Sequence, residues 1–281
     1  MKTQRFRCTR SFRESLPCRN GKSTRKTSSS QRNMKLYKSI AIVFLAALSI
    51  FSSETLGQKY PPPFPRDGTK KADESQCFII WNVVYEDGKS TGMREAPLDQ
   101  VIVFWTEGPV KFTRLDGSWN IEQEKVGSIR FESKGTVEAE EGVSEMPARA
   151  AVFQLKDVLP PKWPVTEGVP DHLRRAGAVK LFETDRVIVW DQTFIPGVPG
   201  PRHQHYDSTA GVWLAGGKTT VTSDPIDGMP IAPIVTTKVP GVVVNHTGLI
   251  KAPHREEELE GSPRIIYVQF KKGALNWGNS R

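Results

Sequence analysis

Cysteine is scarce in this chain. Only three of the 281 residues are Cys, and two of them, Cys8 and Cys18, lie ahead of Met34. Cys77 is therefore the single cysteine of the remaining chain, which excludes an internal disulfide there. It lies in the apolar segment 77–81, and this setting favours a buried core thiol over a reactive nucleophile.

Most of the chain carries no excess of positive charge. The formal net charge is +8, but residues 1–33 carry ten Lys or Arg and one Glu. Residues 58–281 carry 27 Lys or Arg against 29 Asp or Glu. A protein that binds nucleic acid needs a basic surface to neutralise phosphates. We therefore exclude nucleic acid as a main partner.

The apolar run at residues 40–51 is twelve residues long, whereas a membrane-spanning helix needs about 20 apolar residues. It follows a short basic stretch that begins at Met34, and small residues follow it as far as Gly57. This order is typical of a secretory signal. We predict a signal peptide at residues 34–57 and export to the periplasm or the cell exterior, with cleavage near Gly57 or, alternatively, near Ser52.

Residues 1–33 are rich in Arg, Ser and Thr and lack apolar periodicity, so we predict a disordered basic extension there. The favoured interpretation is that Met34 is the true start of the protein. The alternative is a cytoplasmic basic tail on an uncleaved membrane anchor. Under the favoured interpretation, no contact with the membrane remains after the signal is removed.

Helical periodicity is almost absent beyond the leader. The pattern is instead one of short β-branched and aromatic segments separated by Gly, Pro and Asp. Many short strands at regular spacing predict an all-β antiparallel sandwich or barrel. In the first half we expect strands at residues 77–85, 100–106, 127–132 and 149–155.

The strand pattern occurs twice. Three motifs recur at one constant offset along the chain, at 66–68 and 175–177, 80–82 and 189–191, and 87–89 and 196–198. The second copy is longer by six or seven residues, in an expected loop at 223–237. We therefore predict a first barrel at 58–157, a linker at 158–174, a second barrel at 175–272 and a tail at 273–281.

Histidines gather in the second copy. Four of the five fall there: His203, His205, His246 and His254. The i, i+2 spacing of His203 and His205 places both imidazoles on one face of a strand, as a site for one metal ion requires. We expect His254 at the start of a turn before a strand at 264–271. His246 is interpreted as a strand or loop residue rather than a further ligand.

The frame around these histidines resembles a known family. Gly197 and Gly216 around the His pair resemble the first motif of the cupin superfamily, and the Ala-Pro-His triplet ending at His254, followed by Pro263, resembles the second. The likeness covers nearly all of residues 66–272 as a bicupin. It implies two tandem antiparallel cupin (jelly-roll) β-barrels.

The resemblance also implies a metal site. His203, His205 and His254 would bind one divalent transition metal, usually Fe, Mn, Ni, Cu or Zn in this superfamily. Cupins normally place a Glu four or five residues after the second His, where this chain has Thr209 and Ala210. A site of three histidines is known among cupin dioxygenases, and it suits Lewis-acid or oxygenase chemistry.

No catalytic residue is predicted in addition to the metal ligands, and no other cofactor is expected. Tyr206, Asp207 and the acidic run 256–258 are near the histidines in sequence. The acidic run is interpreted as a solvated turn.

The constant offset predicts which residues of the first copy replace the histidines. Arg94 and Ala96 occupy the places of the His pair, or Glu95 and Pro97 after a slip of one residue, and Glu138 matches His254. Without imidazoles, the first barrel should hold no transition metal. We interpret it as a structural barrel that shapes the second barrel or forms the face of a homodimer.

Three functions are compatible with these patterns. The first is an exported metal-dependent enzyme, a three-His dioxygenase-like protein or related oxidoreductase that acts on a small organic substrate. The second is a non-enzymatic module that binds a small molecule. The third is a structural cupin with a vestigial site. The fold alone does not decide between them, because function depends on the site.

Overall fold

The computed structural model describes residues 60–161, 163–173, 175–246 and 252–271. The predicted basic extension, signal peptide and tail lie outside these residues. The described part belongs to one compact unit, Gln58–Arg281. Among the described residues, no helix is long and apolar enough to cross a membrane.

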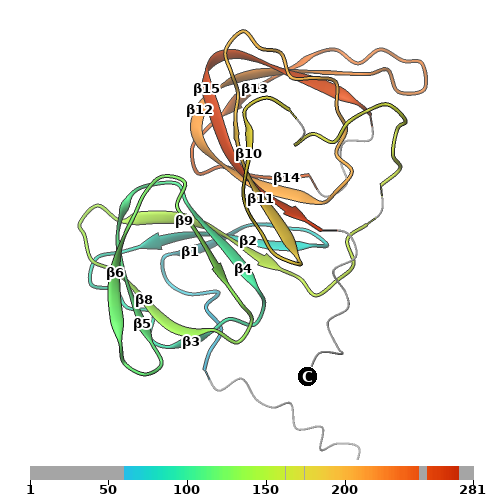
Figure 1. Cartoon of the computed structure of the whole chain (residues 1–281). Helices are drawn as coiled ribbons and strands as arrows, with labels where there is room; N and C mark the ends of the chain where they lie inside the picture. Colours follow the sequence, from blue (N-terminus) through green and yellow to red (C-terminus); the bar gives the residue numbers. More distant parts are fainter. Residues whose placement is uncertain (1–59, 162, 174, 247–251, 272–281) are drawn as a thin grey trace, which may run out of the picture. The chain divides into compact units, whose positions relative to one another are not determined.

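The first copy folds into a barrel of nine strands (Figure 1). They form two antiparallel sheets, in the orders β1-β2-β9-β4-β7 and β3-β8-β5-β6. The strands are β1 Thr69–Glu74, β2 Phe78–Tyr85, β3 Arg94–Glu95, β4 Gln100–Phe104, β5 Gly108–Arg114, β6 Trp119–Glu124, β7 Ile129–Glu132, β8 Val137–Gly142 and β9 Ala148–Leu155.

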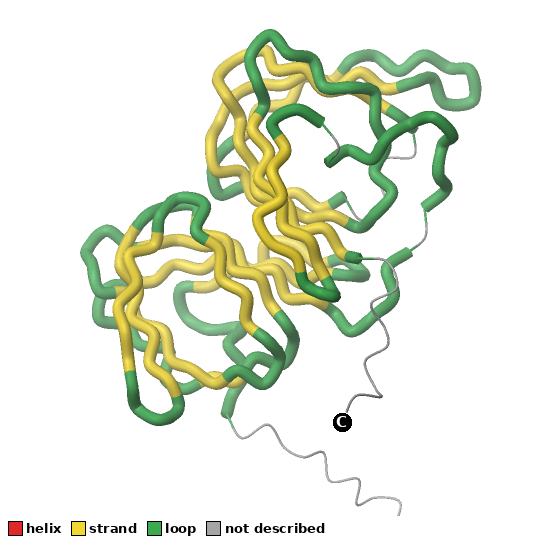
Figure 2. The backbone as a smooth tube through the Cα atoms, viewed as in Figure 1, coloured by secondary structure: helices red, strands yellow, loops and turns green. Residues whose placement is uncertain are grey.

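The second copy folds into a barrel around one sheet with the order β10-β11-β15-β12-β13, in which β14 also pairs with β12. The strands are β10 Ala178–Glu183, β11 Val187–Thr193, β12 Thr209–Ser223, β13 Ile234–Lys238, β14 Val243–Asn245 and β15 His254–Phe270. Figure 2 shows strands and loops without any helix in the described part. The predicted all-β antiparallel fold is confirmed.

Two local predictions were wrong in the second barrel. Residues 223–237 do not form a continuous loop, because β13 begins at Ile234. His254 does not lie in a turn, because it is the first residue of β15, which continues to Phe270. The expected last strand at 264–271 is thus the second half of a longer strand, whose pairing with β12 is irregular on either side of Gly261.

The internal repeat extends to side-chain contacts. In the first barrel the indole Nε1 of Trp81 donates a hydrogen bond of 2.9 Å to Oε1 of Gln154. In the second barrel Nε1 of Trp190 donates one of 2.8 Å to Oε1 of Gln269. Trp190 follows Trp81 at the offset that the sequence predicts. Residues at equivalent sequence positions of the two copies therefore make the same contact in the two barrels.

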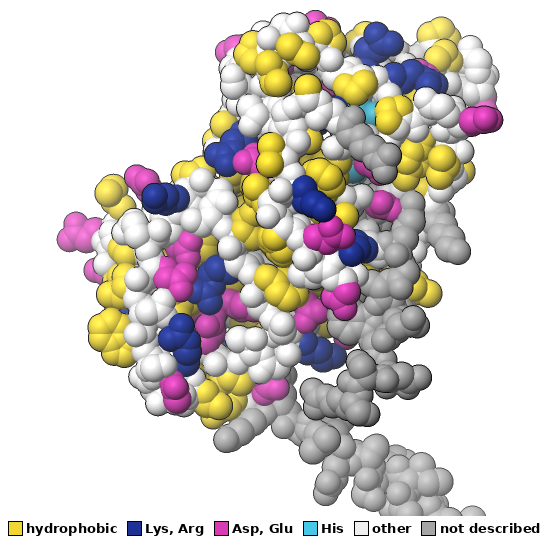
Figure 3. Space-filling model, in the orientation of Figure 1, with side chains coloured by type: hydrophobic (Ala, Val, Ile, Leu, Met, Phe, Trp, Pro, Cys, Tyr) yellow, Lys and Arg dark blue, Asp and Glu magenta, His cyan; other side chains and the backbone are white. Residues whose placement is uncertain are grey.

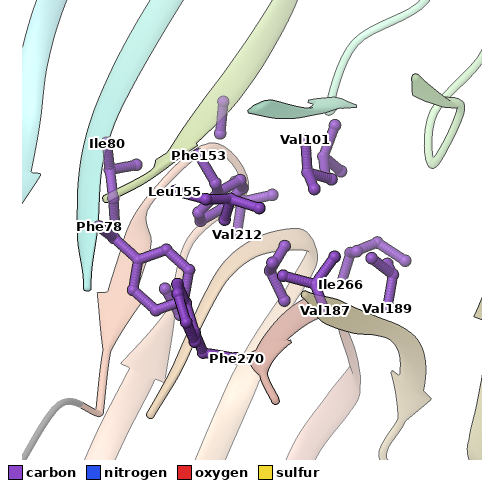
Figure 4. Close-up of a cluster of buried hydrophobic side chains, with 14 of the residues drawn as sticks. Phe78, Ile80, Val101, Phe153, Leu155, Val187, Val189, Val212, Ile266 and Phe270 are labelled. Atoms are coloured by element: carbon purple, nitrogen blue, oxygen red, sulfur yellow. The ribbon is translucent and has the colours of Figure 1, made fainter. Parts of the chain in front are cut away.

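The two barrels share a hydrophobic core (Figure 4). Sixteen buried residues from both copies form one cluster. Within it, the rings of Phe78 and Phe270 pack edge to face with centroids 5.7 Å apart. Cys77 is a fully buried member of this cluster, in agreement with its prediction as a core thiol. Burial of apolar surface from both copies couples their stability.

A buried ion pair also joins the copies. The Arg186 guanidinium is fully buried, and its NH1 group lies 2.8 Å from Oδ2 of Asp99. Its NH2 group donates to the backbone carbonyls of Leu155 and Lys156 at 3.1 and 2.8 Å. A buried charge is tolerated only when such partners satisfy it.

At the surface, acidic and basic side chains are interspersed on the face shown in Figure 3.

Candidate metal centre

Backbone pairing places two of the predicted ligands opposite each other. His203 and His254 form an isolated antiparallel bridge. Each donates its backbone N–H to the carbonyl of the other, at 2.8 and 2.9 Å. His205 lies two residues beyond His203, so its side chain projects from the same face. The backbone thus directs three imidazoles into the second barrel.

The three side chains converge in the barrel interior. One ring nitrogen from each of His203, His205 and His254 lies within 4.8 Å of the other two. The side chains are nearly inaccessible, with exposed fractions of 0%, 8% and 1%. The ring centroids of His203 and His254 are 4.4 Å apart, and that of His205 lies 5.2 Å from His254. This arrangement can present three nitrogens to one ion.

Carbonyl groups select the tautomer of two of these rings. Nδ1 of His203 lies 2.9 Å from the carbonyl oxygen of Pro201, and Nδ1 of His254 lies 3.3 Å from that of Ala252. A carbonyl accepts but cannot donate, so each Nδ1 carries the proton and each Nε2 keeps a free lone pair. This is the form in which imidazole binds a metal.

Of the three predicted ligands, two have a ring nitrogen without a hydrogen-bond partner among the described residues. These nitrogens are Nε2 of His203 and Nδ1 of His205, and both are buried. An orphaned buried polar atom is rare in native proteins and needs an explanation. Coordination of a metal ion would satisfy both atoms, so the donor set fits a transition metal.

The electrostatic environment keeps the imidazoles neutral. Burial, with a contribution from the positive charge of Arg175, lowers the pKa of His203 to about 3. Burial likewise lowers the pKa of His205 well below its ordinary value, and it lowers the pKa of His254. At neutral pH the three rings are therefore uncharged, as ligands must be before a metal binds.

The fifth histidine of the chain, which lies outside the second copy, also reaches the cluster. His172 lies in the predicted linker but is only 1% exposed. Its ring stacks on that of His205 with centroids 3.9 Å apart. The connecting segment is held there by a parallel bridge between Asp171 and Gln204 and by a hydrogen bond from the His172 backbone N–H to the Gln204 carbonyl. The predicted linker therefore forms part of the wall of the site.

Tyr206 also holds this segment in place. Its hydroxyl lies 3.1 Å from the carbonyl of Thr166 and 2.8 Å from that of Val169. The neighbouring Asp207 accepts a hydrogen bond of 2.7 Å from Nε2 of Gln269. Both residues, which are near the histidine pair in sequence, are thus used in structural contacts.

His246 lies beside the three-His group rather than in it. It follows β14, and its backbone N–H donates to the carbonyl of Thr209 at 2.7 Å. Its ring centroid is 4.7 Å from that of His205. Together with His172, this brings all five histidines of the chain into one cluster.

The interpretation of the acidic run 256–258 as a solvated turn was wrong. These residues lie in β15, and the Glu256 carboxylate is mostly buried in an ion pair of 2.7 Å with Arg175. Although burial opposes its ionisation, the positive charge of Arg175 lowers the pKa of Glu256 to about 2. The first barrel has an equivalent pair between Arg66 and Glu140. Since that barrel lacks histidines, this ion pair belongs to the fold rather than to the metal site.

The first barrel keeps the backbone geometry but changes the chemistry. Arg94 pairs with Glu138 across β3 and β8 as His203 pairs with His254. The alignment without a slip is therefore the one that the structure supports. Ala96, which replaces His205, is buried.

Carboxylates occupy the centre of the first barrel. Oxygens of Glu132, Glu138 and Glu140 lie within 4.8 Å of one another. Arg130 pairs with Glu138 at 3.2 Å, and Nε2 of Gln100 donates to Glu132 at 2.5 Å. Burial and the two nearby carboxylates raise the pKa of Glu132 well above its ordinary value. These contacts form a neutralised network in place of imidazoles.

Comparison with known proteins identifies the fold. No family model and no curated protein match the sequence. The structure is similar to oxalate decarboxylase from Lactobacillus farciminis in a formate complex, with a TM-score of 0.51 and 12% identity over 74% of this chain and 82% of that one.

It is also similar to AerE from Microcystis aeruginosa, with a TM-score of 0.50 and 11% identity over 76% of this chain and 99% of that one. A cupin 2 conserved barrel domain protein from Leptotrichia buccalis has a TM-score of 0.46 and 13% identity, over 72% of this chain and 88% of that one. At these identities the likeness concerns the fold alone. The described part of the chain thus has the expected all-β fold of antiparallel, cupin-like jelly-roll barrels.

Proposed function

We propose that this protein is an exported bicupin that binds one divalent transition metal through His203, His205 and His254 and acts on a small organic substrate in a dioxygenase-like manner. The observation that supports it is the convergence of three buried, neutral imidazoles, each with one ring nitrogen within 4.8 Å of a ring nitrogen of the other two. Export is proposed on the sequence of residues 34–57 alone.

The chain prepares the site for such an ion. The carbonyls of Pro201 and Ala252 hold the Nε2 atoms of two ligands unprotonated. The stacked ring of His172 covers His205 and excludes water from that side. A metal bound to three neutral ligands supplies Lewis acidity and open positions for an oxygen-bearing substrate or dioxygen.

A second candidate function is a module that binds a small molecule without turning it over. The contacts of Tyr206 and Asp207 favour it, because both side chains are occupied by structural partners. In that case the metal would orient a ligand and no side chain would transfer a proton. Both candidates require the metal.

Metal content tests the shared requirement. We expect about one transition-metal ion per chain in the purified full-length protein, measured by elemental mass spectrometry after dialysis. The variant with His203→Ala and His205→Ala should retain less than about a tenth of this, because loss of ligands removes the binding free energy. Arg255→Ala, an exposed neighbour of His254, is the matched control and should keep the wild-type content. Equal metal in the wild type and the double variant, or none in either, would contradict the proposal.

A further inference from the structure

The first barrel contains a cavity that the second barrel has closed. A space of about 390 Å³ opens beside the ion pair between Arg66 and Glu140. The corresponding space beside Arg175 and Glu256 measures about 20 Å³. There the loop that includes Pro199 and Pro201 lines the space and narrows it. The flanking ion pair is the same in both copies. The difference in cavity volume therefore comes from this loop and from the residues of the first barrel that replace the histidines.

One of those residues is a cation without a counter-ion. Arg94 is half-buried and lines the cavity. Its Nε donates to the carbonyl of Thr91 at 2.8 Å. Its strand partner Glu138 is instead paired with Arg130. Among the described residues, no Asp or Glu lies within ion-pair distance of the Arg94 guanidinium.

An unpaired guanidinium in a partly buried cavity attracts an anion. Its two remaining nitrogens present a planar fork that matches a carboxylate. The other charges on the cavity wall are largely matched, since Glu140 pairs with Arg66 and Glu86 with Lys89. A third acid, Asp67, lines the exposed rim. Three nearby carboxylates would repel an anion of high charge, so a singly charged ligand fits best.

We propose that the first barrel binds a small organic monocarboxylate in this cavity, with the Arg94 guanidinium as its anchor. The site uses no residue of the metal centre, so this inference goes beyond the proposed function. It also replaces the interpretation of the first barrel as purely structural.

Calorimetric titration of the full-length chain tests the proposal. The probes are acetate, glycolate and benzoate, with acetamide, glycolamide and benzamide as their uncharged counterparts. The titrations are made with EDTA on the variant with His203→Ala and His205→Ala, so that a carboxylate cannot bind at the metal centre. We expect at least one carboxylate to bind with a dissociation constant of about 1 mM or lower, and its amide to bind more than tenfold more weakly.

Substitution of the anchor identifies the site. Arg94→Ala should weaken binding of that carboxylate at least about tenfold, and Arg94→Gln should do the same while keeping a polar side chain near Thr91. Arg114→Ala removes an exposed arginine of the same barrel and should leave the affinity unchanged. Circular dichroism checks that each variant is folded. Failure of all three carboxylates to bind, or an unchanged affinity in a folded Arg94 variant, would overturn the proposal.

Discussion

Arg186→Met should lower the free energy of unfolding by about 3–5 kcal/mol, because it leaves the buried Asp99 carboxylate without its cation. The methionine fills most of the space of the arginine, so the loss would report the missing charge and hydrogen bonds rather than a cavity. It also removes the donors to the carbonyls of Leu155 and Lys156. Urea denaturation followed by tryptophan fluorescence measures the change.

The double variant Arg186→Met with Asp99→Asn separates the causes. Removing the stranded charge should restore at least about half of the lost stability, because a neutral amide is cheaper to bury than a carboxylate. Arg264→Ala is the matched control. This arginine pairs with Asp191 but is about one third exposed, so its loss should cost no more than about 1 kcal/mol. A loss below about 1 kcal/mol for Arg186→Met would show that the ion pair does not hold the two copies together.

Saturation with a transition metal should stabilise the wild-type protein by about 4 kcal/mol when the free ion is present at about a thousand times its dissociation constant. The physical reason is linkage: an ion that binds three converged imidazoles binds the folded state and has no such site in the unfolded chain. Thermal unfolding with and without Zn²⁺ or Co²⁺ measures the effect.

His254→Ala should abolish most of this stabilisation. The backbone bridge to His203 does not depend on the imidazole, so the β pairing can persist while the ligand is lost. His246→Ala is the control, because this ring belongs to the same cluster but lies outside the three-His group. It should leave the greater part of the metal effect in place. An equal metal effect in wild type and His254→Ala would exclude His254 as a ligand.

The fold could be predicted because the duplication is regular. The two copies pair their strands in the same register, so residues separated by the constant offset occupy the same place in each barrel. The offset therefore correctly predicts that Arg94 corresponds to His203. The alternation of side chains along a strand likewise put His203 and His205 on one face. Both inferences rest on the fixed period of β-structure.

The surroundings of the site could not be predicted in the same way. His172 reaches His205 only because Asp171 in the linker pairs with Gln204. No local sequence pattern predicts that pairing. The acidic run at 256–258 looked like a solvated turn, yet the strand places Glu256 against Arg175, which is 81 residues away. Arg94 lacks an acidic partner because the carboxylate of Glu138, its strand neighbour, forms an ion pair with Arg130 instead. No sequence pattern predicts that ion pair. Contacts between distant segments decide these features.

The direct measurement is anomalous X-ray scattering from crystals of the full-length chain loaded with Co²⁺ or Zn²⁺. We predict one strong peak per chain in the C-terminal barrel, about 2.0–2.1 Å from a ring nitrogen of each of His203, His205 and His254. A peak at the carboxylates of Glu132 and Glu138 instead, or the absence of any peak between the three imidazoles, would contradict the proposed metal site.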